Sequence, residues 1–250
     1  MKFCTLASGS SGNSVYIETE NTKILLDAGI SLTQITKRLL GINVDITDLD
    51  AVIITHEHTD HSFALPKLKT PTYVAYKTTG LWKNKENEIR EFDTETTFLI
   101  SDLLITPFSV PHDALDPVGF TVENGKSKLG IVTDAGSVTK LMTEKLKGSN
   151  ALILEFNHDT NMLINSSYPW ELKQRIKSRL GHLSNDQASQ LLMSLLHRNL
   201  LHVVIAHLSK KNNDPELALD AAMKVLTNQF LFETKLTVAP RNNVGEVLQI

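Results

Sequence analysis

Short runs of β-forming residues dominate the first half of the chain. Residues 15–18 and 22–27 form two such runs around a polar turn, which is the pattern of paired strands. Residues 51–55 form a continuous apolar run, as expected of a strand that is buried on both faces. The same patterns predict later strands at residues 103–106, 118–123, 128–133, 151–155, 203–206 and 236–239.

Most of the expected helices lie in the second half of the chain. One helix is expected earlier, because Leu32, Ile35 and Leu39 share a face. Ser31 can cap its start and Gly41 can end it. Further helices are expected from Ser137 to Gly148, from Pro169 to Gly181, behind the capping box Ser184–Gln187, and from Asp214 onward. The polar residues 77–97 indicate no clear element.

An apolar strand ending in Asp-Ala-Gly occurs twice, at residues 24–29 and 131–136. A helical pattern follows each copy, and strand–turn–helix units are common enough for one such pair to arise by chance. The pair also fits two similar halves packed as a sandwich of sheets. In that arrangement Asp27 and Asp134 would each lie at a sheet edge and face the same cleft.

Composition places the chain among ordinary globular proteins. Of its 250 residues 41% are hydrophobic, and the net charge of −3 disfavours non-specific nucleic-acid binding without excluding a local basic groove. Cys4 is the single cysteine, so no intramolecular disulfide can form. No stretch approaches the roughly 20 apolar residues that cross a bilayer, and the apolar run at residues 1–8 is too short for a signal peptide, so none is expected. With no linker in view, we expect a single cytoplasmic domain over residues 1–250 and no membrane partner.

The segment Thr55–His61, with the sequence Thr-His-Glu-His-Thr-Asp-His, carries the clearest chemical signal. Because residues two apart in an extended chain point to the same side, His56 and His58 can hold one metal ion. Asp60 and His61 come where the chain must turn, so they can face a second ion. Imidazole with carboxylate suits zinc, manganese or iron, and the lack of thiolates argues against a structural cysteine site.

Further ligands must come from distant strand ends. His112 lies in a loop between two expected strands, Asp134 ends one strand, and His207 ends another. Polar residues at strand ends beside loops are where functional sites collect. Together with the first cluster they complete two sets of about three ligands and one shared carboxylate, with open positions for water and substrate.

In chain order, these ligand candidates and Asp27 resemble the five motifs of the metallo-β-lactamase superfamily. The resemblance implies an α/β fold, an αββα sandwich of two central sheets flanked by helices, with two divalent metal ions at one edge. Asp27 would orient the ligand loop. The implied ligands are His56, His58 and His112 for the first metal, and Asp60, His61 and His207 for the second, with Asp134 bridging.

A narrower resemblance points to the YycJ/WalJ family of bacterial metallo-hydrolases. It rests on residues 6–14, 112–120, 157–159, 168–170 and 181–185. This resemblance implies a 5′-to-3′ exonuclease that acts on DNA, with links to cell-wall signalling and DNA repair. Residues 62–66 depart from the pattern, because related proteins usually carry a glycine and a longer helix there.

The expected chemistry follows from the metals. Two cations close together can turn a bridging water into hydroxide and neutralise charge on a phosphoryl oxygen. The leaving oxygen also needs a proton, and His182, which precedes a capped helix, is the expected donor; the alternative is a structural role in which His182 bonds a loop carbonyl. Asp60 is expected to serve catalysis as well as metal binding. His158 follows a strand and can either support a ligand or contact substrate.

Two further features can hold a nucleic acid. The Ser/Gly segment 8–14 would let backbone N–H groups approach an anion, although a turn between strands needs no ligand. A basic helix is predicted just before His182, and it is either a solvated face or a grip on a phosphate backbone. Its basic residues are Lys173, Arg175, Lys177 and Arg179.

The leading hypothesis is therefore a phosphodiesterase that acts on DNA ends. A thioester or lactone hydrolase on the same scaffold and a metal-binding regulatory module without catalysis are the alternatives, and the complete ligand set argues against the module. A di-iron protein that reduces oxygen or nitric oxide is disfavoured. Such proteins resemble His-x-Glu-x-Asp, where residues 56–60 of this chain are His-Glu-His-Thr-Asp.

Overall fold

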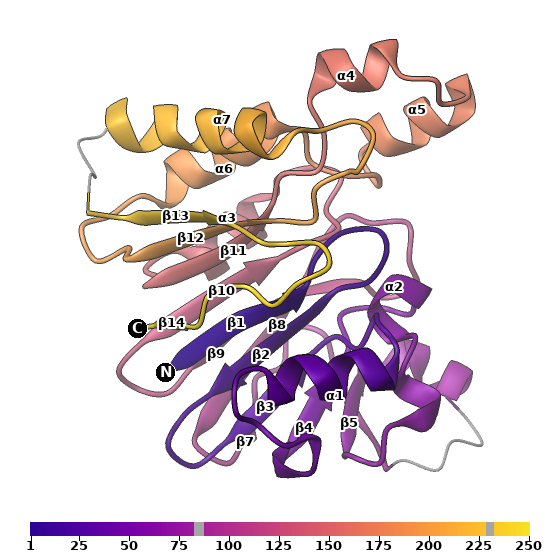
Figure 1. Ribbon diagram of the computed structural model, residues 1–250, viewed down its shortest axis with the longest axis vertical. Helices are drawn as coiled ribbons and strands as arrows, with labels where there is room; N and C mark the ends of the chain where they lie inside the picture. The colour runs from indigo at the N-terminus through magenta and orange to yellow at the C-terminus, as the bar shows by residue number, and fades with distance from the viewer. Residues whose placement is uncertain (83–87, 229–232) are drawn as a thin grey trace.

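Two seven-stranded sheets pack face to face and carry helices on their outer surfaces (Figure 1). The computed structural model describes residues 1–82, 88–228 and 233–250. One sheet has the strand order β14-β1-β2-β3-β4-β5-β6 and the other β13-β12-β11-β10-β9-β8-β7. The α/β class and the αββα sandwich predicted for the sequence are confirmed.

Both sheets follow the same plan. In each, antiparallel strands on one side give way to parallel strands on the other. The first sheet consists of β1 (Lys2–Ala7), β2 (Ser14–Glu18), β3 (Lys23–Leu26), β4 (Ala51–Ile53), β5 (Thr72–Ala75), β6 (Ile89–Phe92) and β14 (Leu248–Gln249). The second consists of β7 (Phe98–Ile100), β8 (Leu103–Ser109), β9 (Val118–Glu123), β10 (Lys128–Val132), β11 (Ala151–Glu155), β12 (His202–Ala206) and β13 (Lys235–Val238).

The repeated Asp-Ala-Gly pattern marks equivalent places in the two sheets. β3 pairs antiparallel with β2 and parallel with β4, and β10 pairs antiparallel with β9 and parallel with β11. Asp27 and Asp134 follow these two strands, and both adopt the left-handed conformation, with φ of 62° and 57°. This conformation is costly for a residue with a side chain and tends to occur at functional sites. The predicted pair of similar halves is therefore present.

Helices cover the outer faces of the sandwich. α1 (Leu32–Leu40) and the short α2 (Thr59–Ser62) belong to the first sheet's side, with the 3-10 turns η1 (Ile46–Asp48), η2 (Leu65–Lys67) and η3 (Tyr76–Trp82). α3 (Lys140–Leu146), α6 (Asn185–Leu195) and α7 (Pro215–Asn228) lie on the second sheet's side. α4 (Thr160–Asn165) and α5 (Trp170–Lys177) project at one end, as Figure 1 shows. No helix in the described ranges is both long and apolar enough to span a membrane.

Two helix boundaries differ from the prediction. α3 begins at Lys140 instead of near Ser137, because the side chain of Thr139 caps it. α5 ends at Lys177, before the predicted end at Gly181, because the chain turns back to bring residues 179–181 against Gly136. Residues 77–97, for which no element was predicted, contain η3 and β6, while residues 83–87 lie outside the described part of the chain.

Three apolar clusters explain why the sequences of the central strands are continuously apolar. On β4, Ala51 and Ile53 belong to the cluster between the sheets, whereas Val52 belongs to the cluster beneath α1. A third cluster joins the second sheet to α3, α6 and α7. Strands that are buried on both faces need apolar side chains at every position, which is the pattern predicted for residues 51–55.

Candidate metal centre

The predicted ligands meet at one end of the sandwich, where the chain leaves β4, β8, β10 and β12. Within the described residues, four groups of side chains have potential ligand atoms that all lie within 4.8 Å of one another. These groups are His56–His58–His112, Asp60–His61–His207, His56–His61–Asp134, and Asp134–Glu155–His182–His207. The first two are the ligand sets that the family resemblance implies. Asp134 belongs to both of the others, so it lies between the two sets, where a bridging ligand would be.

Unpaired buried atoms support this arrangement. His56 Nε2, Asp134 Oδ2 and His207 Nε2 are buried without a hydrogen-bond partner among the described residues. Asp134 Oδ2 lies 3.0 Å from His61 Nε2, but without hydrogen-bond geometry. Leaving a polar group buried and unpaired costs about 1–3 kcal/mol, so such groups normally have a partner. A divalent cation satisfies lone pairs of imidazole and carboxylate, and this donor set fits zinc, manganese or iron.

The imidazoles lie too close together to be charged at once. The ring centroid of His56 is 4.6 Å from that of His58, 4.1 Å from that of His61 and 5.1 Å from that of His112. Burial, helped by the neighbouring His61, holds the pKa of His56 well below its usual value, and burial also lowers the pKa of His112. Both rings are therefore neutral near pH 7, which is the form that binds a metal.

His207 and Asp134 are ligand candidates whose pKa values are shifted by neighbours of opposite charge. Burial acts to lower the pKa of His207, but the carboxylates of Asp134, Asp60 and Glu155 raise it to about 10. Burial acts to raise the pKa of Asp134, but His207 and His61 hold it well below its usual value. The carboxylate of Asp134 is thus ionised and ready to bind a cation.

Asp27 holds the ligand segment Thr55–His61 in place through hydrogen bonds. Its Oδ1 accepts hydrogen bonds from Thr55 N at 2.8 Å and Thr55 Oγ1 at 3.0 Å, and its Oδ2 accepts one from His61 Nδ1 at 2.7 Å. These contacts leave Nε2 of His61 as the metal-facing nitrogen. Asn13 Nδ2 lies 3.0 Å from that nitrogen, so a metal ion would take the place of this hydrogen bond. The geometry fits the orienting role that the resemblance implies for Asp27.

Glu155, at the end of β11, is a functional candidate that the sequence analysis missed. It is fully buried, and its Oε1 accepts hydrogen bonds from His182 Nδ1 at 2.7 Å and His207 Nδ1 at 2.9 Å. Its Oε2 accepts a bond from Ala135 N at 3.0 Å. Burial acts to raise its pKa, but His182 and His207 lower it to about 2. The available signal was a single charge at the end of the apolar run 151–155.

His182 and His158 differ in their access to the site. His182 lines a cavity of about 280 Å³ together with the ligand candidates. Its Nδ1 bonds Glu155 and not a loop carbonyl; it is His112 whose Nδ1 donates to a loop carbonyl, that of Gly181, at 3.0 Å. His158 is buried and does not line the cavity, and burial lowers its pKa to about 4. Substrate contact by His158 is therefore disfavoured.

The Ser/Gly segment 8–14 ties the two sheets together at the site. Ser8 Oγ accepts a hydrogen bond from His207 N at 2.7 Å, and Asn13 N donates to Asp60 O at 2.7 Å. Gly9 N donates to Asn13 Oδ1, and Gly12 N donates to Gly9 O. These N–H groups already have acceptors inside the protein, which disfavours the anion-binding interpretation. Ser10 is the residue of this segment that lines the cavity.

The predicted basic helix is shorter and less uniform than expected. Of its four basic residues, all of which the structure describes, Arg175 is the one that lines the cavity. Its Nε donates to Asp113 Oδ2 at 2.6 Å. Lys173 instead donates from Nζ to the carbonyl of Ile164 at 2.7 Å, and Arg179 lies beyond the end of the helix. Of the two alternatives, the solvated face therefore suits Lys173, Lys177 and Arg179, and Arg175 is the one of the four placed to contact a substrate.

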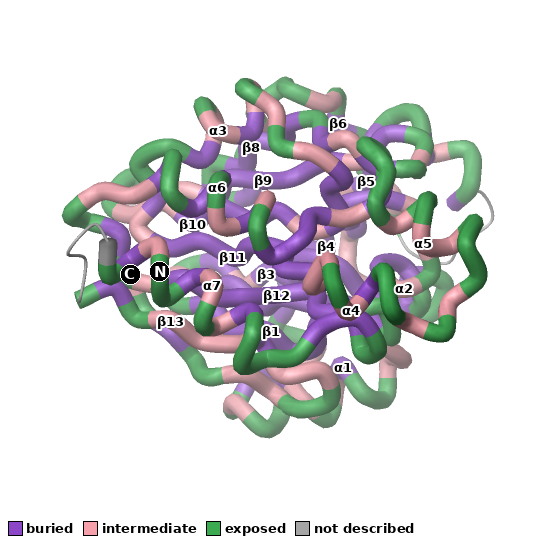
Figure 2. The backbone as a smooth tube through the Cα atoms, turned by 90° about the horizontal axis from the view of Figure 1, so that it is seen from above, coloured by how far each residue is buried: buried purple, intermediate pink, exposed green. Residues whose placement is uncertain are grey.

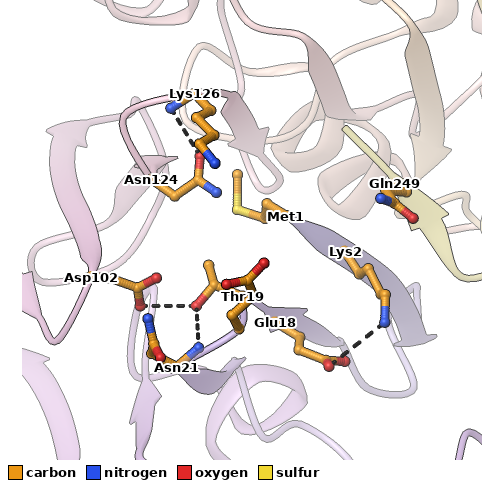
Figure 3. A pocket seen from close by; sticks show the side chains of 10 residues that line it. Met1, Lys2, Glu18, Thr19, Asn21, Asp102, Asn124, Lys126 and Gln249 are labelled. Carbon is orange, nitrogen blue, oxygen red and sulfur yellow. Dashed lines mark hydrogen bonds and ion pairs between the residues drawn. The ribbon is translucent and has the colours of Figure 1, made fainter.

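A larger hollow of about 480 Å³ lies at the opposite end of the strands (Figure 3). Its lining includes Met1, Glu18, Asp102 and Lys126. Thr19 Oγ1 donates to Asp102 at 2.9 Å, and the ammonium of Lys2 faces Glu18 at 3.8 Å. These polar groups satisfy one another, so we place the chemistry in the smaller cavity beside the histidines.

Comparison with known proteins gives the family. Residues 22–203 match the model of the beta-lactamase superfamily domain. The chain is 35% identical to the exodeoxyribonuclease YycJ of Bacillus anthracis, covering 90% of this chain and 89% of the relative. It is 37% identical to the exodeoxyribonuclease WalJ of Streptococcus pneumoniae D39, covering 87% and 85%. The crystal structure of the metallo-beta-lactamase fold protein YhfI from Bacillus subtilis, 16% identical, superposes over 97% of this chain and 98% of that one with a TM-score of 0.75. The chain therefore belongs to the metallo-β-lactamase superfamily, in the family of YycJ and WalJ, and is a metal-dependent hydrolase.

Proposed function

We propose that the protein is a phosphodiesterase with two divalent metal ions that degrades DNA from its ends in the 5′-to-3′ direction. The observation that carries the proposal is the pair of ligand groups joined by Asp134 and open to one cavity. The relatives named exodeoxyribonuclease, at 35–37% identity, support the substrate class. We further propose that residues 1–250 are one domain, because the central apolar cluster takes side chains from both sheets.

The ligand sets divide between the two ions. His56, His58 and His112 would hold one, Asp60, His61 and His207 the other, and Asp134 both. When bound, two such ions supply a nucleophile from water near neutral pH and neutralise charge on a phosphoryl oxygen. Asp27 and Glu155 fix the orientation of His61 and His207 through their Nδ1 atoms, which leaves Nε2 of each ring as the nitrogen that would bind the ion.

His182 is suited to protonate the leaving oxygen. Glu155 holds its Nδ1, so Nε2 is left for a substrate atom in the cavity. Burial acts to lower the pKa of His182, but Glu155 raises it above its usual value, which favours the protonated, donating form at neutral pH. Asp60 lines the same cavity and would hold one of the ions next to a bound substrate.

A thioester or lactone hydrolase remains the second candidate, because the same metal chemistry cleaves acyl bonds. Arg175 in the cavity wall favours a phosphate substrate over an uncharged ester. The test is a panel of DNA and RNA oligonucleotides, thioesters and lactones, assayed with protein loaded separately with zinc, manganese and iron. We expect DNA to be cleaved fastest.

End-labelled DNA tests the direction of cleavage. An oligonucleotide with a blocked 5′ end should resist the enzyme, whereas one with a blocked 3′ end should be degraded like unblocked DNA. Equal cleavage of end-blocked and free-ended DNA would show that the exonuclease assignment is wrong. Faster turnover of a thioester or lactone than of any phosphodiester would favour the second candidate.

A further inference from the structure

We propose that Tyr168, Leu172 and Ile176 form a pocket for the nucleobase at the end of the bound strand. The protein would then hold a strand end by its base as well as by its phosphate. This inference rests on the proposed function and names the part of the substrate that the cavity wall recognises.

Tyr168, Leu172 and Ile176, called the apolar wall below, border the same cavity as the ligand cluster. Leu172 and Ile176 are four residues apart on α5 and therefore share one face of the helix. Both line the cavity, as does Tyr168, which comes two residues before the helix. The lining also contains ligand candidates such as His58 and Asp134. The cavity lining thus combines apolar and aromatic side chains with potential metal ligands.

These apolar side chains have no part in the protein core. None of the eight residues of α5, all of them described, is buried; Leu172 and Ile176 are half-buried, and Figure 2 shows this segment as a mixture of exposed and intermediate positions. Tyr168, Leu172 and Ile176 belong to none of the three apolar clusters found among the described residues. An apolar surface that stabilises no core and borders a reactive cavity is suited to contact a ligand.

Cations around this wall point to a nucleotide and not to a plain acyl chain. The ammonium of Lys211 lies 5.2 Å over the ring of Tyr168. Arg175 lines the same cavity, and Arg241 donates to the carbonyl of Leu208 at 2.6 Å, next to the cavity-lining Ser209. Lys211 thus places positive charge beside the ring of Tyr168, and Arg175, paired with Asp113, places a guanidinium in the cavity lining. Aromatic surface combined with cations is how proteins hold the bases and phosphates of a single strand.

Binding of small ligands tests the wall without any need for turnover. Calorimetry with metal-loaded protein would compare a deoxynucleoside 5′-monophosphate with deoxyribose 5-phosphate, which lacks the base. Tyr168→Ala should weaken binding of the nucleotide about 5- to 100-fold, the range of base–aromatic stacking, and leave binding of the sugar phosphate unchanged. Tyr168→Phe should retain nucleotide binding. Tyr76→Ala is the matched control, because Tyr76 is 62% exposed and does not line the cavity.

Cleavage of an oligonucleotide with an abasic terminal residue gives the second measurement. Wild-type protein should cleave it about 5- to 100-fold more slowly than the normal end, and this difference should disappear in Tyr168→Ala. Equal wild-type rates on both ends, or an equal loss on both ends in Tyr168→Ala, would overturn the inference while the exonuclease function stands. If no phosphodiester is cleaved but Tyr168→Ala still weakens nucleotide binding selectively, the proposed function fails and the base pocket stands. Absence of any nucleotide preference over sugar phosphate would also overturn it.

Discussion

Replacing Glu155 by glutamine is the most informative change, because one carboxylate holds two imidazoles of the site. Its Oε1 accepts from His182 Nδ1 and His207 Nδ1, and its Oε2 accepts from Ala135 N at 3.0 Å and Leu183 N at 3.2 Å. Glutamine has nearly the same shape but offers only one oxygen. Whichever way its amide is oriented, two buried donors face an NH₂ group and lose their acceptor.

The cost follows from these contacts. A buried hydrogen bond to a charged group is worth about 1.5–3 kcal/mol, and 1.4 kcal/mol corresponds to a tenfold change in an equilibrium constant. If the amide nitrogen faces the imidazoles, His207 loses the bond that orients its ring. We therefore expect Glu155→Gln to weaken the ion held by Asp60, His61 and His207 about 10- to 100-fold. The ion at His56, His58 and His112 should keep its affinity.

Competition against a chromophoric chelator, titrated through both metal equivalents, separates the two affinities. Thermal unfolding of the metal-free variant shows whether it still folds. Asp27→Asn removes the equivalent partner of His61 and should weaken the same ion, whereas Glu20→Gln, at an exposed position, should change neither affinity. If folded Glu155→Gln binds both ions like the wild type, then Glu155 does not act through His207 and the reasoning fails.

Four shorter predictions test other parts of the site and core. His58→Ala should lose at least one of two metal equivalents by elemental analysis, and full occupancy would contradict its ligand role. His182→Ala should slow turnover roughly 10²–10⁴-fold with metal content unchanged, and a wild-type rate on a substrate with a poor leaving group would exclude the donor role. Because burial raises the pKa of the Cys4 thiol to about 12, a thiol reagent at pH 8 should not react until unfolding; prompt reaction of native protein would contradict the buried position. Arg175→Gln should weaken DNA binding and its salt dependence more than Lys177→Gln does, and equal effects would remove Arg175 from the substrate path.

Local sequence patterns determined most of the architecture. The runs at residues 51–55 and 151–155 correspond to β4 and β11, since strands buried between layers must be apolar on both faces. The capping box at Ser184–Gln187 begins α6, because cap hydrogen bonds join residues three apart in the chain. His56, His58, Asp60 and His61 all lie in one short segment, so their pattern could be recognised from the sequence alone. The structure brings these residues together with the distant ligand candidates.

Tertiary structure alone decided what lies around those ligands. Glu155 receives hydrogen bonds from His182 and His207, which are far from it in the chain, so no local pattern distinguishes it from any charge at a strand end. The pattern of basic residues before His182 likewise carried no information on which of them faces the cavity. The helix ends early, where the chain turns back against Gly136, and Arg175 is the one that reaches the site. Periodicity reports the faces of a single element, whereas the partners of a buried charge depend on how separate elements pack.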